Sequence, residues 1–223
     1  MLRELAHFAL HAPATIALKL KASQDTLYAT LIARADAAGM AEQRDALVAD
    51  LRGDIVEVGC GTGAMFASYR GDARITGIEP DAEFASRARD AAASRGRRIT
   101  VVDARAEALP LADASMDAAV LALVLCSVAD VDAACQELAR VVRPGGAVRL
   151  IEHVRSPRIV AGALMSLANP VWLAANGQGC RMNRNPLGAL ARAGLRVDSV
   201  EPFQIWSAGL PAFPMRRIAA TRV

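Results

Sequence analysis

Residues 54–66 read Asp-Ile-Val-Glu-Val-Gly-Cys-Gly-Thr-Gly-Ala-Met-Phe, and no other segment says as much about the architecture of this chain. The β-branched start predicts a short strand, and glycines at positions 59, 61 and 63 follow it. Glycines in such a turn let backbone N–H groups approach a ligand with no Cβ in the way, at the positive end of a helix. The segment therefore predicts a strand, a tight turn and a helix start that hold a nucleotide-like cofactor.

From this segment onward, predicted strands and helices alternate. The strands are expected at about 54–59, 73–79, 98–103, 117–123 and 146–152, and the helices between them at about 64–70, 81–95 and 130–142. Leu195–Val200 and Arg216–Val223 add two last strands that can form an antiparallel pair. This order predicts an α/β fold: a Rossmann-like, doubly wound sheet of seven strands, mostly parallel with an antiparallel C-terminal strand.

Turn and cap residues mark the ends of these elements. Asp81 can cap the helix that follows Pro80, and the run Arg143-Pro144-Gly145-Gly146 ends the next helix. Asn185 and Pro186 fit the start of a further helix, and Gly194 fits its end.

We interpret residues 1–223 as a single domain. Apolar residues at helical spacing predict two or three helices within residues 1–50, which would form a lid. Residues 51–223 form the core, with insertions for substrate near 154–184 and 202–214.

Composition excludes several classes of protein. The apolar fraction is 53% and the charged fraction 22%, as in globular proteins, and the net charge of +3 is too small to indicate nucleic acid as a partner. The four cysteines, at 60, 126, 135 and 180, contain no Cys-x-x-Cys pair, so their spacing predicts neither a metal site nor disulfides, and a reducing cytoplasm is expected. The apolar stretch Leu5–Leu18 is interrupted and too short to span a bilayer.

The glycine pattern alone leaves two cofactors open. Gly59, Gly61 and Ala64 satisfy the dinucleotide fingerprint, and Glu79 lies about 20 residues on, where a ribose-binding acid belongs. An NAD-dependent oxidoreductase would also have these glycines and this acid. Glu57, two positions before the first glycine, favours a cationic sulfonium donor instead, because a pyrophosphate gains nothing from a carboxylate there.

Three motifs resemble one superfamily. Glu57–Gly63 resembles motif I of the class I S-adenosylmethionine-dependent methyltransferases of the type 11-like kind. Ala106–Asp117 resembles the segment before their fourth strand, and Glu137–Gly146 the junction into their fifth. Val124–Val128 and Glu152–Val154 are similar to a narrower branch, which holds the membrane-associated thiol methyltransferases of animals and bacterial small-molecule or phospholipid methyltransferases. The resemblance implies S-adenosylmethionine as cofactor.

The resemblance also implies a donor site. Glu79, beside Pro80, would accept hydrogen bonds from the ribose hydroxyls, although a solvated carboxylate is the alternative. Glu57 would hold the amino end of the donor together with the loop of Gly59, Cys60, Gly61 and Gly63, or would only bond local backbone. Ala106 and Glu107 would approach the adenine through backbone N–H groups, and Leu123 would border the donor. Relatives often carry aspartate where this chain has Arg105. Asp103 could replace it, or could simply end its strand.

Candidate acceptor residues follow the fourth and fifth strands. Cys126 and Ser127 would border the transferred methyl group, and no nucleophilic role is expected for Cys126. His153 could take a proton from the acceptor, or could fix the end of its strand. Arg181 could bind a carboxylate or phosphate, or lie in a solvated loop. Trp172, together with Phe203, Trp206 and Phe213, could line an apolar acceptor pocket, or pack in the core.

The sequence thus predicts a cytoplasmic enzyme that transfers a methyl group to N, O or S of a small or amphiphilic acceptor by in-line displacement. One alternative is a phospholipid or membrane-lipid N-methyltransferase, with residues 1–20 and 157–175 in peripheral contact with a membrane. Another is a non-catalytic scaffold that binds S-adenosylmethionine, and an NAD-dependent oxidoreductase comes third. No nucleic-acid partner and no transmembrane segment are expected.

Overall fold

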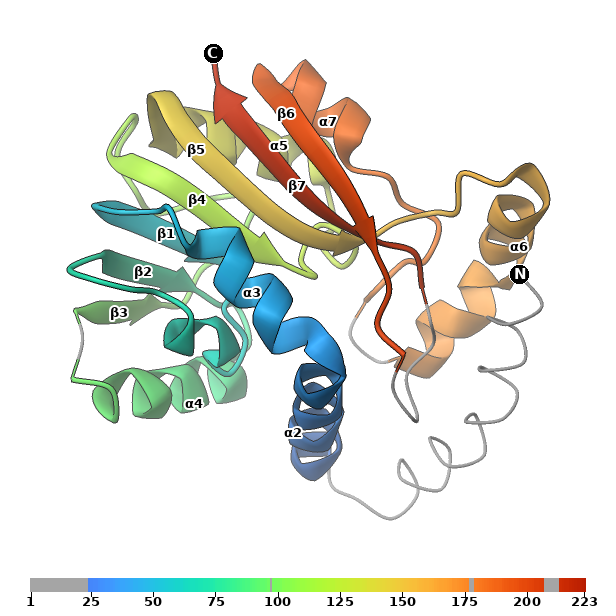
Figure 1. Ribbon diagram of the computed structural model, residues 1–223, viewed down its shortest axis with the longest axis horizontal. Coiled ribbons are helices and arrows are strands. Elements are labelled where there is room, and N and C mark those ends of the chain that lie inside the picture. Colours follow the sequence, from blue (N-terminus) through green and yellow to red (C-terminus); the bar gives the residue numbers. More distant parts are fainter. Residues whose placement is uncertain (1–23, 97, 177–178, 207–212) are drawn as a thin grey trace.

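The computed structural model describes residues 24–96, 98–176, 179–206 and 213–223. Seven strands form one sheet in the order β3-β2-β1-β4-β5-β7-β6 (Figure 1). The first five strands in this order are parallel to one another, and β7 runs antiparallel to both β5 and β6. The predicted seven-stranded sheet is therefore confirmed. Its strands are β1 (Asp54–Val58), β2 (Arg74–Ile78), β3 (Ile99–Val102), β4 (Met116–Ala122), β5 (Val142–His153), β6 (Leu195–Phe203) and β7 (Met215–Arg222).

Helices cover both faces of the sheet. One face packs against α3 and α4 through a core that includes Leu47, Ile75 and Ala88, and the other packs against α5 and α7 through Leu138 and Leu190. This is the doubly wound arrangement that the alternation predicts. The helices and short turns are α2 (Gln24–Ala35), η1 (Asp36–Met40), α3 (Ala41–Val48), η2 (Ala64–Ala67), α4 (Ala82–Ala93), α5 (Val131–Val141), α6 (Ile159–Asn176) and α7 (Leu187–Arg192).

The helix expected over residues 64–70 is wrong in kind, because only the short 3₁₀ turn η2 forms there. The regular turn ends at Ala67, and within it Met65 and Phe66 are buried. By contrast, Asp81 caps α4 as predicted, since its carboxylate accepts hydrogen bonds from the backbone N–H groups of Glu83 and Phe84, both at 3.0 Å.

Strand β5 begins earlier than predicted. The run expected to separate helix from strand, residues 143–146, is already part of β5, and the register with β4 shifts between Met116 and Ala118. Gly145 has a φ of +76°, so the irregular start of the strand takes up the proline and glycines.

The sheet order reverses between β1 and β4. β1 pairs with β2 on one side and with β4 on the other. In open parallel sheets, ligands bind at the carboxyl ends of the strands at such a reversal. The loops that follow β1 and β4 meet there, and a Cβ built on Gly59 would lie only 2.6 Å from Val124 Cγ2.

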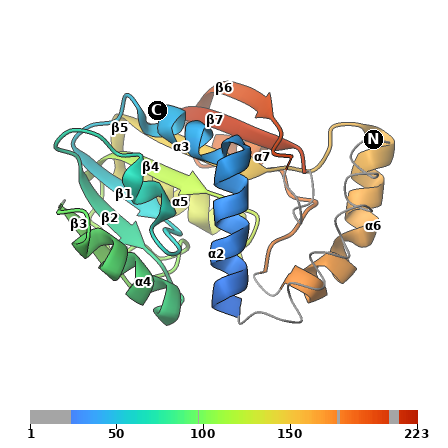
Figure 2. The same cartoon turned by 60° about the horizontal axis from the view of Figure 1, so that its bottom comes forward.

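Two segments extend from this core. Helix α2, which precedes α3 in the chain, extends beyond the edge of the sheet. Helix α6, which follows β5, stands apart from the sheet in both views (Figure 1, Figure 2). Helix α6 contains Pro170 and lies within the insertion predicted near 154–184. None of the helices in the described ranges is both long and apolar enough to cross a bilayer. The first of the helices expected in residues 1–50 falls outside the described residues, and so does much of the second insertion.

Candidate functional site

The glycine loop after β1 is tied to the end of β2 by backbone hydrogen bonds. The N–H groups of Gly59 and Cys60 both donate to the carbonyl of Ile78, at 2.8 and 3.0 Å, and Gly63 N–H donates to Cys60 O at 2.9 Å. All three glycines of the motif have positive φ, between +55° and +81°, a region that other residues rarely adopt. The loop is thus a fixed structure.

Glu79 joins this loop to the start of α4. It follows β2, is only 7% exposed, and each of its carboxylate oxygens accepts one backbone N–H: Oε2 from Gly61 at 2.9 Å and Oε1 from Asp81 at 3.0 Å. Burial raises the pKa of this carboxyl, and the two amides oppose the shift. Since a carboxylate has about four acceptor positions, Glu79 keeps capacity for two further O–H donors.

Glu57 is a second buried carboxyl group near the loop. Burial raises its pKa to about 8, although the Tyr69 hydroxyl and the Arg44 guanidinium oppose the shift. Its Oε2 has no hydrogen-bond partner among the described residues. Both Glu57 and Glu79 raise the pKa of the Cys60 thiol, which places two acidic groups around one residue of the loop. A cation bound at the loop would be stabilised by them.

Glu152, near the end of β5, fixes the loop that follows β4. Its Oε1 accepts hydrogen bonds from the N–H groups of Val124 and Leu125, both at 2.8 Å, and burial raises its pKa to about 7. Leu123, at the start of this loop, has a φ of +63° and is 42% exposed. A strained residue held in this way at the switch point is typical of a functional site.

Three sulfur and nitrogen groups meet beside this loop. His153 Nε2 lies 2.8 Å from Cys180 Sγ, and Cys126 Sγ lies 3.4 Å from Ser127 Oγ. Hydrogen bonding from the Cys126 thiol, from His153 and from Trp172 lowers the pKa of Cys180 to about 4, while the same contact raises the pKa of Cys126. Hydrogen bonds within the cluster thus favour a cysteine thiolate at this place.

Aromatic rings surround this cluster. The Phe213 ring lies 5.2 Å from that of His153 and 5.2 Å, edge to face, from that of Trp172. The predicted aromatic lining of an acceptor pocket thus includes two rings that the structure brings together with His153. Phe203 lies elsewhere, on a larger cavity.

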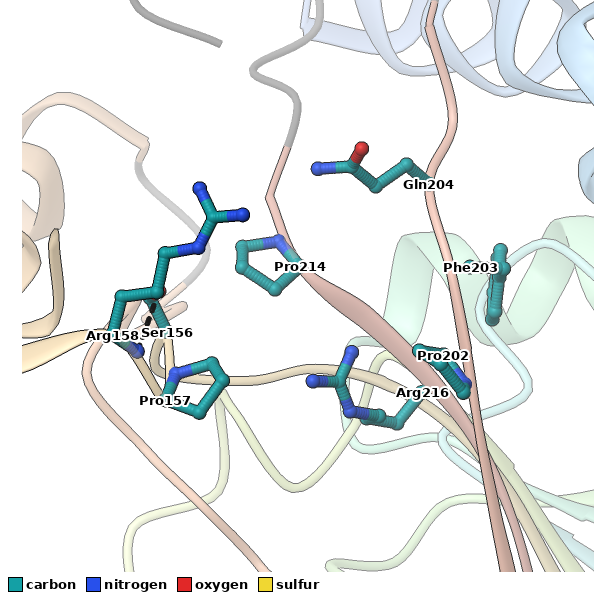
Figure 3. A pocket seen from close by; sticks show the side chains of 8 residues that line it. All are labelled: Ser156, Pro157, Arg158, Pro202, Phe203, Gln204, Pro214 and Arg216. Carbon is teal, nitrogen blue, oxygen red and sulfur yellow. Dashed lines mark hydrogen bonds between the residues drawn. The ribbon is translucent and has the colours of Figure 1, made fainter. Parts of the chain in front are cut away.

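Two cavities open at this end of the sheet. The larger, about 340 Å³, lies between the segment after β5 and the adjoining ends of β6 and β7 (Figure 3). Its described lining carries two guanidinium groups and three prolines: Ser156, Pro157, Arg158, Pro202, Phe203, Gln204, Pro214 and Arg216. The smaller, about 100 Å³, is bordered by Cys126, Glu152 and His153. The two residues at the end of β5 thus both line it.

Comparison with known proteins decides the family. Residues 56–150 match the family described as the methyltransferase domain. Thiol S-methyltransferase TMT1B of Rattus norvegicus is 33% identical over 171 residues, which cover 71% of this chain and 69% of that protein. The chain belongs to the class I S-adenosylmethionine-dependent methyltransferases. S-adenosylmethionine is therefore the methyl donor of this methyltransferase.

Solved structures share the fold of this methyltransferase. The YcgJ protein of Bacillus subtilis has a TM-score of 0.68 at 16% identity, over 82% of this chain and 98% of that one. Geranyl diphosphate C-methyltransferase of Streptomyces coelicolor, solved with Mg²⁺, geranyl diphosphate and S-adenosyl-L-homocysteine, has a TM-score of 0.65 at 17% identity, over 82% and 81%.

Other predicted residues of the methyltransferase are held by contacts within the protein. Glu107 accepts hydrogen bonds from Ala129 N–H at 2.8 Å and Asp130 N–H at 3.3 Å, and so ties the loop after β3 to the start of α5. Arg105 lies 3.5 Å from the Glu107 carboxylate, and Asp103 pairs with Arg89. The structure thus gives the side chains of Asp103 and Arg105 partners on the surface.

The polar stretch after residue 180 supports the loop after β4. Arg184 Nη1 donates to the carbonyls of Leu125 at 2.8 Å and Val128 at 2.6 Å, and Arg181 N–H donates to Cys126 O at 2.9 Å. Sequence reasoning missed this role of Arg184, and it also missed Cys180, which no motif marks.

The buried carboxyl of Glu57 predicts a pH effect on stability. Its pKa is raised from 4.5 to about 8 in the folded methyltransferase, so unfolding releases a proton between these values. The free energy of unfolding should fall as pH rises through this window, by up to about 1.4 kcal/mol per pH unit from this group. Glu57→Gln cannot ionise at this position, so its free energy of unfolding should not fall in this way. Urea unfolding at pH 5, 6.5 and 8 should therefore show the stability of the variant rising, relative to that of the native protein, as pH rises. The exposed Glu83→Gln is the control, and parallel pH profiles for Glu57→Gln and the native protein would refute the prediction.

Proposed function

We propose that Glu57, Gly59, Cys60, Gly61, Gly63, Glu79, Pro80, Ala106, Glu107 and Leu123 form the donor site. The fixed glycine loop and the free acceptor positions of the buried Glu79 carboxylate support this. Glu79 would accept hydrogen bonds from the two ribose hydroxyls, and the Glu57 oxygen without a partner in the described residues would face the cationic end of the donor. When bound, the donor supplies an electrophilic methyl group on a positively charged sulfur.

We propose further that the acceptor is the sulfur of a small or amphiphilic thiol. The observation that carries this proposal is the meeting of Cys126, His153 and Cys180, whose sulfur and nitrogen atoms all lie within 4.8 Å of one another, with His153 Nε2 2.8 Å from Cys180 Sγ. Hydrogen bonding in this cluster lowers the pKa of Cys180, which favours a thiolate there. Groups that hold one thiolate can hold another that enters next to it. The rat relative is named as a thiol S-methyltransferase, which agrees with the proposal.

In this proposal the protein supplies alignment and proton removal. Holding acceptor and methyl group in line can contribute about 7–11 kcal/mol to lowering the barrier. Cys126, Ser127 and Trp172 would border the acceptor, and Arg181 would steady the loop beneath it. His153 would take the proton of the acceptor thiol through Nδ1, which has no hydrogen-bond partner among the described residues, while its Nε2–H donates to Cys180 Sγ. Of the helices before β1, α3 packs against the sheet, and α2, which extends beyond it, would act as the lid.

Three acceptors that differ in one atom test the proposal. Thiophenol, phenol and aniline share a ring, so release of S-adenosylhomocysteine from each compares S, O and N directly. We expect thiophenol to be methylated and the other two to react at least about 100-fold more slowly. For 2-phenylethanethiol, an aliphatic thiol that is still protonated at neutral pH and so needs the base, His153→Ala should lower kcat by about 10²-fold or more. Faster reaction with aniline or phenol would overturn the thiol proposal and leave the donor site intact.

A lipid acceptor is the second candidate, because of the surface of α6. Val160, Leu164, Leu167 and Val171 are all exposed and follow helical spacing along one face of α6. The larger cavity, which begins just before α6, carries the guanidiniums of Arg158 and Arg216, which suit a phosphate group (Figure 3). An apolar face beside a basic cavity is typical of peripheral contact with anionic lipid.

Replacing Leu167 with glutamate should weaken binding to anionic vesicles. Leu167 is 79% exposed, so the substitution adds a charge that lipid contact would have to bury, without disturbing the core. Co-sedimentation with phosphatidylglycerol vesicles measures the effect, and we expect a loss of roughly tenfold or more. Val223→Glu, at an equally exposed residue far along the chain, is the matched control. If the native protein stays in the supernatant, the lipid candidate fails.

A further inference from the structure

Three strong metal ligands from distant parts of the chain converge at the acceptor side of the site. Cys126 comes from the loop after β4, His153 ends β5, and Cys180 lies between α6 and α7. Their ligand atoms all lie within 4.8 Å of one another, and the first two residues are buried. We propose that Cys126, His153 and Cys180 bind one zinc ion.

The geometry is close to what zinc needs. In a tetrahedral site with Zn–S of about 2.3 Å and Zn–N of about 2.0 Å, neighbouring ligand atoms lie about 3.5–3.8 Å apart. The present cluster brackets this range, with 2.8 Å between His153 Nε2 and Cys180 Sγ and at most 4.8 Å elsewhere. Shifts of about 1 Å or less would therefore admit the ion, and coordination would replace the Nε2···Sγ hydrogen bond.

The donor set also selects the ion. Two thiolates and an imidazole favour zinc over magnesium or calcium, which prefer oxygen. The charges of two thiolates balance that of a divalent cation, so the buried group would be neutral. His153 Nδ1, which has no hydrogen-bond partner in the described part of the chain, would carry the proton while Nε2 binds the metal.

The cluster leaves one coordination position open. Within the described ranges, no fourth histidine, cysteine or carboxylate joins the three ligands. Zinc with three protein ligands and one open position is the arrangement of catalytic sites, and a thiol that binds zinc is deprotonated. The open position would take the acceptor thiol, a step that rests on the proposed function. His153 would then act as a metal ligand, because a lone pair bound to zinc cannot accept a proton.

Cobalt(II) is the probe that reports both binding and ligand type. We expect the full-length protein, purified under reducing conditions and freed of metal, to bind one Co²⁺ per chain with a sulfur-to-cobalt charge-transfer band and tetrahedral d–d bands, both displaced by Zn²⁺. Cys180→Ser should weaken binding by about 100-fold or more, whereas Cys135→Ser, at a buried cysteine in α5 outside the cluster, should bind normally. Added thiophenol should intensify the charge-transfer band of the native protein.

Three results would overturn the inference. They are a native protein that takes up no Co²⁺, a cobalt spectrum without sulfur charge transfer, and a Cys126–Cys180 disulfide in the reduced-buffer preparation by mass spectrometry. If Cys180→Ser does not fold, protection of Cys126 and Cys180 from iodoacetamide by Zn²⁺ in the native protein serves instead, and equal alkylation with and without Zn²⁺ would also overturn it. The proposed function fails separately: cobalt bound through sulfur without thiol methylation supports the metal site alone.

Discussion

Glu79→Ala is expected to weaken S-adenosylhomocysteine binding by roughly 100-fold or more. Hydrogen bonds to a charged group contribute about 1.5–3 kcal/mol each, and the ribose would lose two of them. The substitution also leaves Gly61 N–H without its acceptor, so the glycine loop loses a contact on which its shape depends. Isothermal titration calorimetry measures the change in Kd.

Two further variants serve as comparisons for Glu79→Ala. Glu79→Gln keeps one acceptor oxygen and should bind with intermediate affinity, whereas Glu83→Ala, at an exposed carboxylate in the first turn of α4, should bind as the native protein does. Circular dichroism shows whether each variant is folded. A folded Glu79→Ala protein with native affinity would remove Glu79 from the proposed donor site.

The second large effect is expected for Gly59→Ala. Gly59 has a φ of +67°, which costs a residue with a side chain about 1–2 kcal/mol. Its added Cβ would also lie 2.6 Å from Val124 Cγ2, and overpacking of this kind costs about 1–3 kcal/mol more. The free energy of unfolding, from urea denaturation, should therefore fall by about 2–5 kcal/mol.

Gly71 provides the matched control. Its φ is +65°, nearly that of Gly59, but a Cβ built on it meets nothing within 4 Å. Gly71→Ala should therefore show the backbone cost alone, and the difference between the two variants measures the contact with Val124. Gly59→Ala combined with Val124→Ala should recover part of that difference. Equal losses at Gly59 and Gly71 would mean that the loops after β1 and β4 do not pack as described.

Local patterns predicted most of the fold. The β-branched run before the glycines, the cap at Asp81 and the alternation of strands with helices each depend on near neighbours in the chain, and the structure confirms them. The general rules of parallel sheets leave only a few possible strand orders, and the structure shows which of them the chain adopts. The short turn η2 is an exception, because no local signal in residues 64–70 separates a four-residue 3₁₀ turn from a longer helix.

The acceptor side was harder to predict because its residues come from separate segments. The ends of strands point to Cys126 and His153 as candidates, but Cys180 lies in the loop between α6 and α7, 27 residues beyond His153, and no motif marks it. Only the folded chain shows that these three side chains meet. The same holds for Arg184, whose contacts with the carbonyls of the loop after β4 depend on how the insertion returns to the core.

The place of β7 in the sheet bears on the order in which the site is assembled. β6 precedes β7 in the chain but reaches the sheet only through it, since β7 lies between β5 and β6. His153 pairs with Met215 of β7, and Val154 N–H donates to Pro214 O, so the acceptor side is completed only when this late strand inserts. The glycine loop, in contrast, is held by the end of β2 and by the loop after β4, and all the strands that support these two contacts precede β7 in the chain. During synthesis the chain could therefore form its donor loop before it has an acceptor pocket, and a polypeptide that stops short of β7 would have the first without the second.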